Sequence, residues 1–301
     1  MKGIVNECDY DFFLKQMASF LKQENKEEKG YFWLGKGRNG KGTTTDVLRN
    51  VLGSYWGELN MEYYINQSKD VDRPNQNLFN CRNARVLNSS EVNDTDAFNR
   101  PTTFISANFK TMTGQDMHCP REVGSKRTAE FVAGKTLIQT NKMPGFSKID
   151  LPLKERIVVQ EFPFTFTDDA DLLQKDPLKY KVKDITLKDK FKNEEYRIAF
   201  TDILFEKYKE YKIEYIIPLS VKKFTQSYFT EHCIKSFIEE NFEEASNENI
   251  SLEYIKQEYK KMEDKLLSVK TIKEQLEESG YEVKKIRGTY ELKYYKIKDV
   301  V

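Results

Sequence analysis

The sequence predicts an α/β fold in which a central parallel sheet is flanked by helices, followed by a helical lid and a small C-terminal domain. An apolar, strand-like run, Tyr31–Leu34, leads into a glycine-rich loop and then into a segment with helical periodicity. Two further short strand-like runs, 84–87 and 135–140, follow at intervals of about fifty residues and lead into polar residues. Short apolar strands separated by helical segments are typical of parallel sheets.

The glycine-rich loop has the residues that a phosphate-binding loop needs. Gly35, Gly40 and Lys41 match the spacing G-x-x-x-x-G-K. In such a loop the glycines let backbone N–H groups surround the β-phosphate, and the lysine reaches the β- and γ-phosphate oxygens. A plain glycine turn would need neither the lysine nor three glycines. We expect these residues to contact the nucleotide: Gly35, Gly37, Asn39, Gly40, Lys41, Gly42, Thr43 and Thr44.

One position in the loop departs from the usual pattern. A Ser or Thr normally follows the lysine and binds Mg²⁺, but here Gly42 stands there and the hydroxyl comes one residue later, at Thr43. Thr43 is therefore the candidate metal ligand in the loop. The Gly-Lys-Gly-Thr ending also resembles the loop of adenylate-type nucleotide kinases, so the loop predicts nucleotide binding without choosing the reaction.

Composition bounds the classes of function. The chain has 301 residues, with 49 Lys and Arg against 48 Asp and Glu, so any nucleic-acid binding must come from local clusters of charge. No apolar run approaches the roughly 18 residues of a membrane span, and the N-terminus lacks the pattern of a signal peptide, so we expect a soluble intracellular protein. The scattered cysteines, without a C-x-x-C pair, argue against a zinc site or a disulfide framework.

Two polar residues that follow predicted strands are candidates for the chemistry. Glu91 comes shortly after the run 84–87, where an acidic residue of a nucleotide hydrolase can hold Mg²⁺ and polarise the attacking water. Asn141 ends the run 135–140 and can hydrogen-bond both the γ-phosphate and the water. Each also has an ordinary interpretation, as a solvated loop residue or a turn residue.

Five motifs occur in a characteristic order. They are Gly35–Lys41, the run 84–87 with Glu91, Lys110–Asp116, Leu137–Pro144 and Glu155–Phe166. The series resembles that of superfamily 3 helicases, and especially the helicase part of the primase-helicases of poxviruses and other large DNA viruses and of related phage and plasmid replication proteins. The resemblance covers roughly Gly30 to Phe166.

The resemblance implies an AAA+ type domain that acts as a ring, usually a hexamer. Such a ring hydrolyses ATP with Mg²⁺ and moves 3′ to 5′ along single-stranded DNA. Lys41 and Thr43 would then contact phosphate and metal, Glu91 would serve the metal and the water, and Asn141 would sense the γ-phosphate. Arg156 would be an arginine finger for the neighbouring subunit.

Arg156 also has a simpler interpretation, as the partner of Glu155 or another local carboxylate. The segment between Asp116 and Lys135 resembles the region that carries the family's pore hairpin, with a turn at Gly124-Ser125. Its cations would bind the phosphate backbone, although an isolated pair is also typical of a solvated hairpin tip. The candidate DNA-binding residues in this part of the chain are Lys110, Arg121, Lys126 and Arg127.

We predict three domains: an ATPase core over residues 1–167, a helical lid over 168–230, and a C-terminal domain over 231–301. Helical periodicity near 252–259 and 269–276, followed by a hairpin divided at Arg287-Gly288, suggests a winged helix. Lys284 and Arg287 would be available to DNA phosphates. A protein-docking module with a charged face is the alternative.

Three functions remain open from the sequence. The first is a replicative DNA helicase motor that forms homo-oligomers on single-stranded DNA. The second is a nucleotide kinase, favoured only by Gly42 and Thr43, and the third is a nucleotide-dependent DNA-binding or loading factor. Only about 30 residues precede the strand that leads into the phosphate loop, so we expect either that another chain carries the priming activity or that this is a stand-alone or trimmed helicase. A primase and other replication proteins are thus candidate partners.

Overall fold

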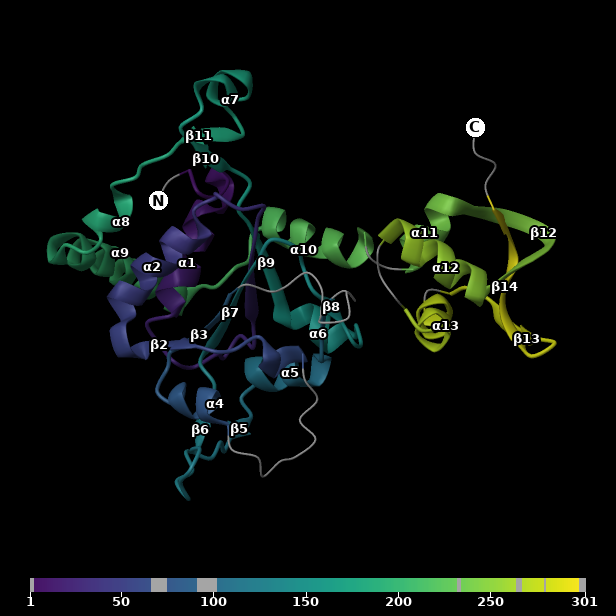
Figure 1. Cartoon of the computed structure of the whole chain (residues 1–301), viewed down its shortest axis with the longest axis horizontal. Helices are drawn as coiled ribbons and strands as arrows, with labels where there is room; N and C mark the ends of the chain where they lie inside the picture. Colours follow the sequence, from purple (N-terminus) through teal and green to yellow (C-terminus); the bar gives the residue numbers. More distant parts are fainter. Residues whose placement is uncertain are drawn as a thin grey trace. The chain divides into compact units, whose positions relative to one another are not determined.

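The computed structural model describes residues 3–65, 75–90, 102–231, 234–263, 267–278 and 280–297. These form two compact units, one within 1–93 and 102–225 and the other from Gln226 onward. Figure 1 shows their elements. Within the described residues, no helix is both long and apolar enough to cross a membrane.

The first unit is built on a parallel sheet of five strands in the order β2-β3-β7-β1-β9. The strands are β1 (Gly30–Leu34), β2 (Trp56–Glu58), β3 (Val86–Ser89), β7 (Lys135–Thr140) and β9 (Ile157–Glu161). This confirms the predicted α/β fold. The second strand, predicted over 84–87, lies two residues later, over Val86–Ser89.

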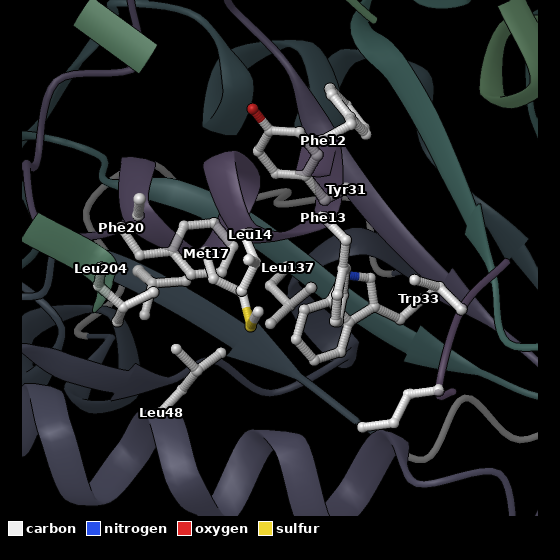
Figure 2. Close-up of a cluster of buried hydrophobic side chains, with 14 of the residues drawn as sticks. Phe12, Phe13, Leu14, Met17, Phe20, Tyr31, Trp33, Leu48, Leu137 and Leu204 are labelled. Atoms are coloured by element: carbon white, nitrogen blue, oxygen red, sulfur yellow. The ribbon is translucent and has the colours of Figure 1, made fainter. Parts of the chain in front are cut away.

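Helices cover both faces of the sheet, as the alternation along β1 requires. Tyr31 and Trp33 face the core against α1 (Tyr10–Ser19), α2 (Lys41–Leu52) and α9 (Glu194–Ile213). Figure 2 shows Phe13 beside Trp33 and Leu137 in this cluster. Phe32, between them in sequence, packs on the other face against an aromatic cluster. The cluster consists of Phe104, Phe109 and Phe146. Burying one such ring contributes roughly 1.5–3 kcal/mol.

The remaining elements of the first unit are short. They are η1 (Glu7–Asp9), η2 (Gly53–Tyr55), α3 (Glu62–Ile65), α4 (Gln76–Asn80), β4 (Thr103–Phe104), α5 (Ser106–Thr113), β5 (Met117–His118), β6 (Phe131–Val132), β8 (Gly145–Phe146), α6 (Leu151–Arg156), β10 (Thr165–Thr167), α7 (Ala170–Lys175), β11 (Tyr180–Val182) and α8 (Leu187–Lys190). Helix α9, in the predicted lid, packs on α1 and α2 and so belongs to this unit. Helix α10 (Leu219–Glu231) leads into the second unit.

The second unit has the winged-helix-like order of helix, strand, two helices and hairpin. Its elements are α11 (Ile234–Asn241), β12 (Phe242–Ser251), α12 (Leu252–Glu263), α13 (Val269–Glu278), β13 (Val283–Ile286) and β14 (Thr289–Ile297). The strands form an antiparallel sheet in the order β12-β14-β13. Strand β12 was not predicted, because it is rich in Glu and Asn and its register shifts between Glu244 and Asn249.

Candidate nucleotide site

The phosphate loop joins β1 to α2 at the carboxyl edge of the parallel sheet. Three of its residues have left-handed backbone: Gly37 (φ +82°), Arg38 (φ +48°) and Gly40 (φ +87°). This conformation suits glycine, and it curls the chain into a concave turn that ends at the amino terminus of α2. The dipole of α2 favours an anion there.

Lys41, the first residue of α2, is held at the centre of this turn. Its ammonium donates to the carbonyl oxygen of Gly35 and to Oδ1 of Asn141, the latter at 3.2 Å. Asn141 follows β7, which lies directly beside β1 in the sheet. The structure therefore brings together two site residues that lie a hundred positions apart.

The Lys41 ammonium is largely withdrawn from water. The residue is 7% exposed, and burial lowers the pKa of its side chain to about 8. Both of its partners are neutral acceptors, so the positive charge has no anionic partner among them. A bound phosphate would supply the missing negative charge and raise the pKa again.

Gly35 and Asn39 pack tightly at the start of the loop. A Cβ on Gly35 would lie 2.0 Å from Nδ2 of Asn39 and 2.7 Å from the backbone oxygen of Phe162, so only glycine fits. Asn39 is buried, and within the described residues its Nδ2 has no hydrogen-bond partner. A buried donor without an acceptor, beside a lysine without an anion, fits a phosphate ligand.

The residues proposed for Mg²⁺ are only partly within the described structure. Thr43 is half-buried in the first turn of α2, whereas the Thr44 hydroxyl donates to the Gly40 carbonyl oxygen at 2.9 Å. A Cβ at Gly42 would meet nothing within 4 Å, so the position of the usual hydroxyl is open. Glu91 lies outside the described residues, two positions after Ser89, the last residue of β3.

A polar ladder that sequence reasoning missed crosses the sheet next to this site. Gln139 Nε2 on β7 donates to Asn88 Oδ1 on β3 at 2.8 Å, and Asn88 Nδ2 donates to Glu58 Oε2 on β2 at 2.7 Å. These contacts fix β3 laterally just before the chain leads to Glu91. The sequence signal was a side-chain amide in each of two neighbouring strands, Asn88 and Gln139.

Arg156 lies at the opposite edge of the sheet. It directly precedes Ile157, which pairs with Gly30 at the start of β1, whereas the phosphate loop follows the end of β1. Its guanidinium forms an ion pair with Glu28 at 2.6 Å, and Nη1 donates to the Lys110 carbonyl oxygen at 3.5 Å. A local carboxylate does pair with Arg156, but it belongs to Glu28.

Comparisons with known proteins place these residues in a family context. No family model matches the chain. It is 29% identical over 205 residues to V13 of Sputnik virophage, which is named a helicase; the match covers 66% of this chain and 25% of that protein. It is 22% identical over 241 residues to 022R of Frog virus 3, also named a helicase, with coverage of 76% and 24%. The chain is thus similar to viral proteins that are named helicases.

Primase D5 of Fowlpox virus is similar as well, with 25% identity over 185 residues, covering 61% of this chain and 23% of that protein. The resemblance predicted from the motifs is thereby confirmed. The chain spans about a quarter of the length of the curated relatives it matches. Among solved structures, the apo A form of the NrS-1 C-terminal region aligns with a TM-score of 0.46 and 13% identity, over 93% of this chain and 69% of that one.

The segment predicted to be a pore hairpin is a hairpin in the structure. Strands β5 and β6 pair, and an Arg121–Thr128 bridge extends the ladder toward a turn with Gly124 at φ +73°. Lys126 and Arg127 are exposed near the tip, where Arg127 makes a long ion pair of 3.9 Å with Glu122. The tip thus presents two cations to solvent.

The other DNA-binding candidates have local carboxylate partners or lie at a turn. Lys110 forms an ion pair with Asp150 at 2.9 Å, and Lys284 forms one with Glu282 at 2.5 Å. Arg287 occupies the turn between β13 and β14 with φ +48°. Of these predicted residues, only Lys126 and Arg127 are adjacent exposed cations at a hairpin tip.

Proposed function

We propose that the chain is the motor part of an ATP-dependent DNA helicase of superfamily 3, acting as a ring, most simply a hexamer. It would move 3′ to 5′ along single-stranded DNA during viral, phage or plasmid replication. The observation that carries this proposal is the buried Lys41 ammonium, held by Asn141 at the carboxyl edge of the sheet in a chain similar to viral proteins that are named helicases. Similarity to a poxvirus protein named a primase supports a primase as a candidate partner.

The loop residues would hold the triphosphate of ATP. Lys41 can transfer its hydrogen bonds from neutral oxygens to β- and γ-phosphate oxygens, which are stronger acceptors. Asn141 accepts from Lys41 through its amide oxygen, so its amide nitrogen can donate to the γ-phosphate or the attacking water. Thr43 and Glu91 would hold Mg²⁺, which neutralises phosphate charge.

The positions of Lys41 and Arg156 support a site shared between protomers. Strand β1, which separates them, has five residues and therefore a length of about 15 Å. An Arg156 side chain at the amino edge cannot contact phosphates held at the carboxyl edge of its own chain. In a ring, Arg156 of one protomer would contact the γ-phosphate held by the next, which accelerates phosphoryl transfer by roughly 10³–10⁵.

The test measures ATP hydrolysis with and without single-stranded DNA. We expect DNA to stimulate hydrolysis, Lys41→Ala to abolish it, and unwinding to require a 3′ single-stranded tail. Mixing Lys41→Ala with Arg156→Ala should restore activity that neither variant has alone, since one supplies the finger and the other the nucleotide site. Transfer of phosphate to a nucleoside monophosphate would instead establish a kinase. Binding of ATP without turnover would establish a loading factor.

A further inference from the structure

The loop from Asn25 to Lys29 contacts the end of helix α6 that carries Arg156. Lys29 Nζ donates to the carbonyl oxygen of Glu155, one of the carbonyls left unpaired where α6 ends. Glu28 forms the 2.6 Å ion pair with Arg156. Two adjacent residues of one loop therefore fix the backbone and the side chain at this point of the sheet edge.

Asn25 shapes this loop from within. It is 1% exposed, and its Nδ2 donates to the carbonyl oxygens of Lys29 and Thr113 at 3.0 and 2.9 Å. The Glu28 N–H donates to the Asn25 carbonyl oxygen at 2.9 Å. The turn is thus anchored to the end of α5, and its geometry holds independently of the Glu28 side chain.

Glu28 adopts a backbone conformation that glutamate rarely occupies. Its φ is +52°, in the left-handed region where a Cβ is unfavourable and glycine or asparagine is preferred. Strain of this kind persists where the surrounding structure imposes it, and often where the side chain has a use. This side chain forms the ion pair with Arg156.

We propose that Glu28 is the positioning residue for Arg156 and aims its guanidinium at the nucleotide of the neighbouring protomer. The inference rests on the proposed function, in which Arg156 acts between protomers. The Glu28 carboxylate contacts Nη2 of Arg156, and the Lys110 carbonyl oxygen accepts from Nη1. Arginine has five N–H donors, so others remain for a phosphate. The Arg156 side chain is 21% exposed, so it is anchored and still reachable from outside the protomer.

Mixed oligomers test this directly. The finger donor is Lys41→Ala, whose own site is inactive, and the acceptor is Arg156→Ala, which has an intact phosphate loop. We expect the donor Lys41→Ala with Glu28→Gln to restore roughly ten- to a hundredfold less activity than Lys41→Ala alone, because misplacement of a catalytic group lowers the rate steeply. The KM for ATP, set by the acceptor, should not change. Adding Glu28→Asp instead, which keeps the charge, should restore part of the lost activity.

Glu28→Gly in the donor is the matched control for folding. Glycine suits φ +52°, so this variant should unfold at least as high in temperature as its parent while lacking the carboxylate. If the Glu28→Gly donor restores activity as well as Lys41→Ala alone, or if the losses appear in KM rather than kcat, Glu28 does not position Arg156. If mixing with Lys41→Ala does not restore ATP hydrolysis to Arg156→Ala, the proposal of a site shared between protomers is refuted, and the role of Glu28 is refuted with it.

Discussion

ATP affinity should decrease with rising pH near pH 8, because one buried ammonium carries the phosphate contact. Burial lowers the pKa of Lys41 in the free protein to about 8. Its charged fraction is then about nine-tenths at pH 7 and about one-tenth at pH 9. If only the charged form binds the triphosphate, the association constant decreases about tenfold over this range, and it approaches a tenfold loss per pH unit above it.

The direction of this pH dependence follows from the linkage between proton binding and phosphate binding. Bound phosphate favours the charged ammonium, so the pKa of Lys41 is higher in the complex than in the free protein, and raising the pH through the free value weakens binding. Titration with a fluorescent ATP analogue between pH 6.5 and 9.5, at constant ionic strength and without metal, measures the effect. Omitting the metal removes changes in Mg²⁺ binding from the comparison.

Lys41→Arg provides the control, because its guanidinium stays charged over the whole range. That variant should bind ATP more weakly than the parent protein, since its geometry differs, but with an affinity that is flat from pH 7 to 9. A parent protein with a flat profile, or an arginine variant with the same slope, would refute the assignment of the phosphate contact to a buried Lys41.

Two further predictions follow from the loop and the hairpin. Gly35→Ala should lower ATP affinity at least tenfold, because its Cβ would lie 2.7 Å from the Phe162 carbonyl oxygen. Gly42→Ser adds its side chain in open space, so it should keep the affinity for ATP and make that affinity depend more strongly on Mg²⁺. Equal losses of affinity for the two variants in ATP titrations would contradict this. Replacing Lys126 and Arg127 together by alanine should weaken single-stranded DNA binding and reduce the slope of log affinity against log salt concentration by about 1.4. Lys284→Ala should change the affinity for this DNA less than about twofold in anisotropy titrations, because Lys284 is paired with Glu282. The reverse order would refute the role of the hairpin.

A strand could be predicted where an apolar centre is followed by turn residues. Residues 135–140 were predicted and observed with the same limits: Leu137 and Ile138 lie at the centre, and Asn141 and Pro144 follow. Strand β2 (Trp56–Glu58) escaped prediction, because three residues give no periodicity. Strand β12 was not predicted because its Glu and Asn residues have low strand propensity. Its pairing with β14 stabilises a strand that the local sequence does not favour.

The site could be predicted only where topology follows from motif order. Lys41 and Asn141 meet because each follows a parallel strand, and parallel neighbours end at the same edge. The partner of Arg156 had no such signal. Glu28 lies in a run of four charged residues, 26–29, that reads as a solvated turn, and its left-handed backbone depends on a side chain, Asn25, anchored to a distant helix.

The two units differ in net charge, and this difference bears on which of them binds DNA. From residue 226 to the end, sixteen acidic residues outnumber thirteen basic ones, although the chain as a whole carries +1. On α13, Lys273 pairs with Glu277 at 2.9 Å and Lys270 with Glu274 at 4.0 Å, so this helix has no row of uncompensated cations. Affinity for a polyanion comes from cations that release counterions, and carboxylates beside them oppose it. The charge pattern therefore favours the first unit over the second for contact with DNA.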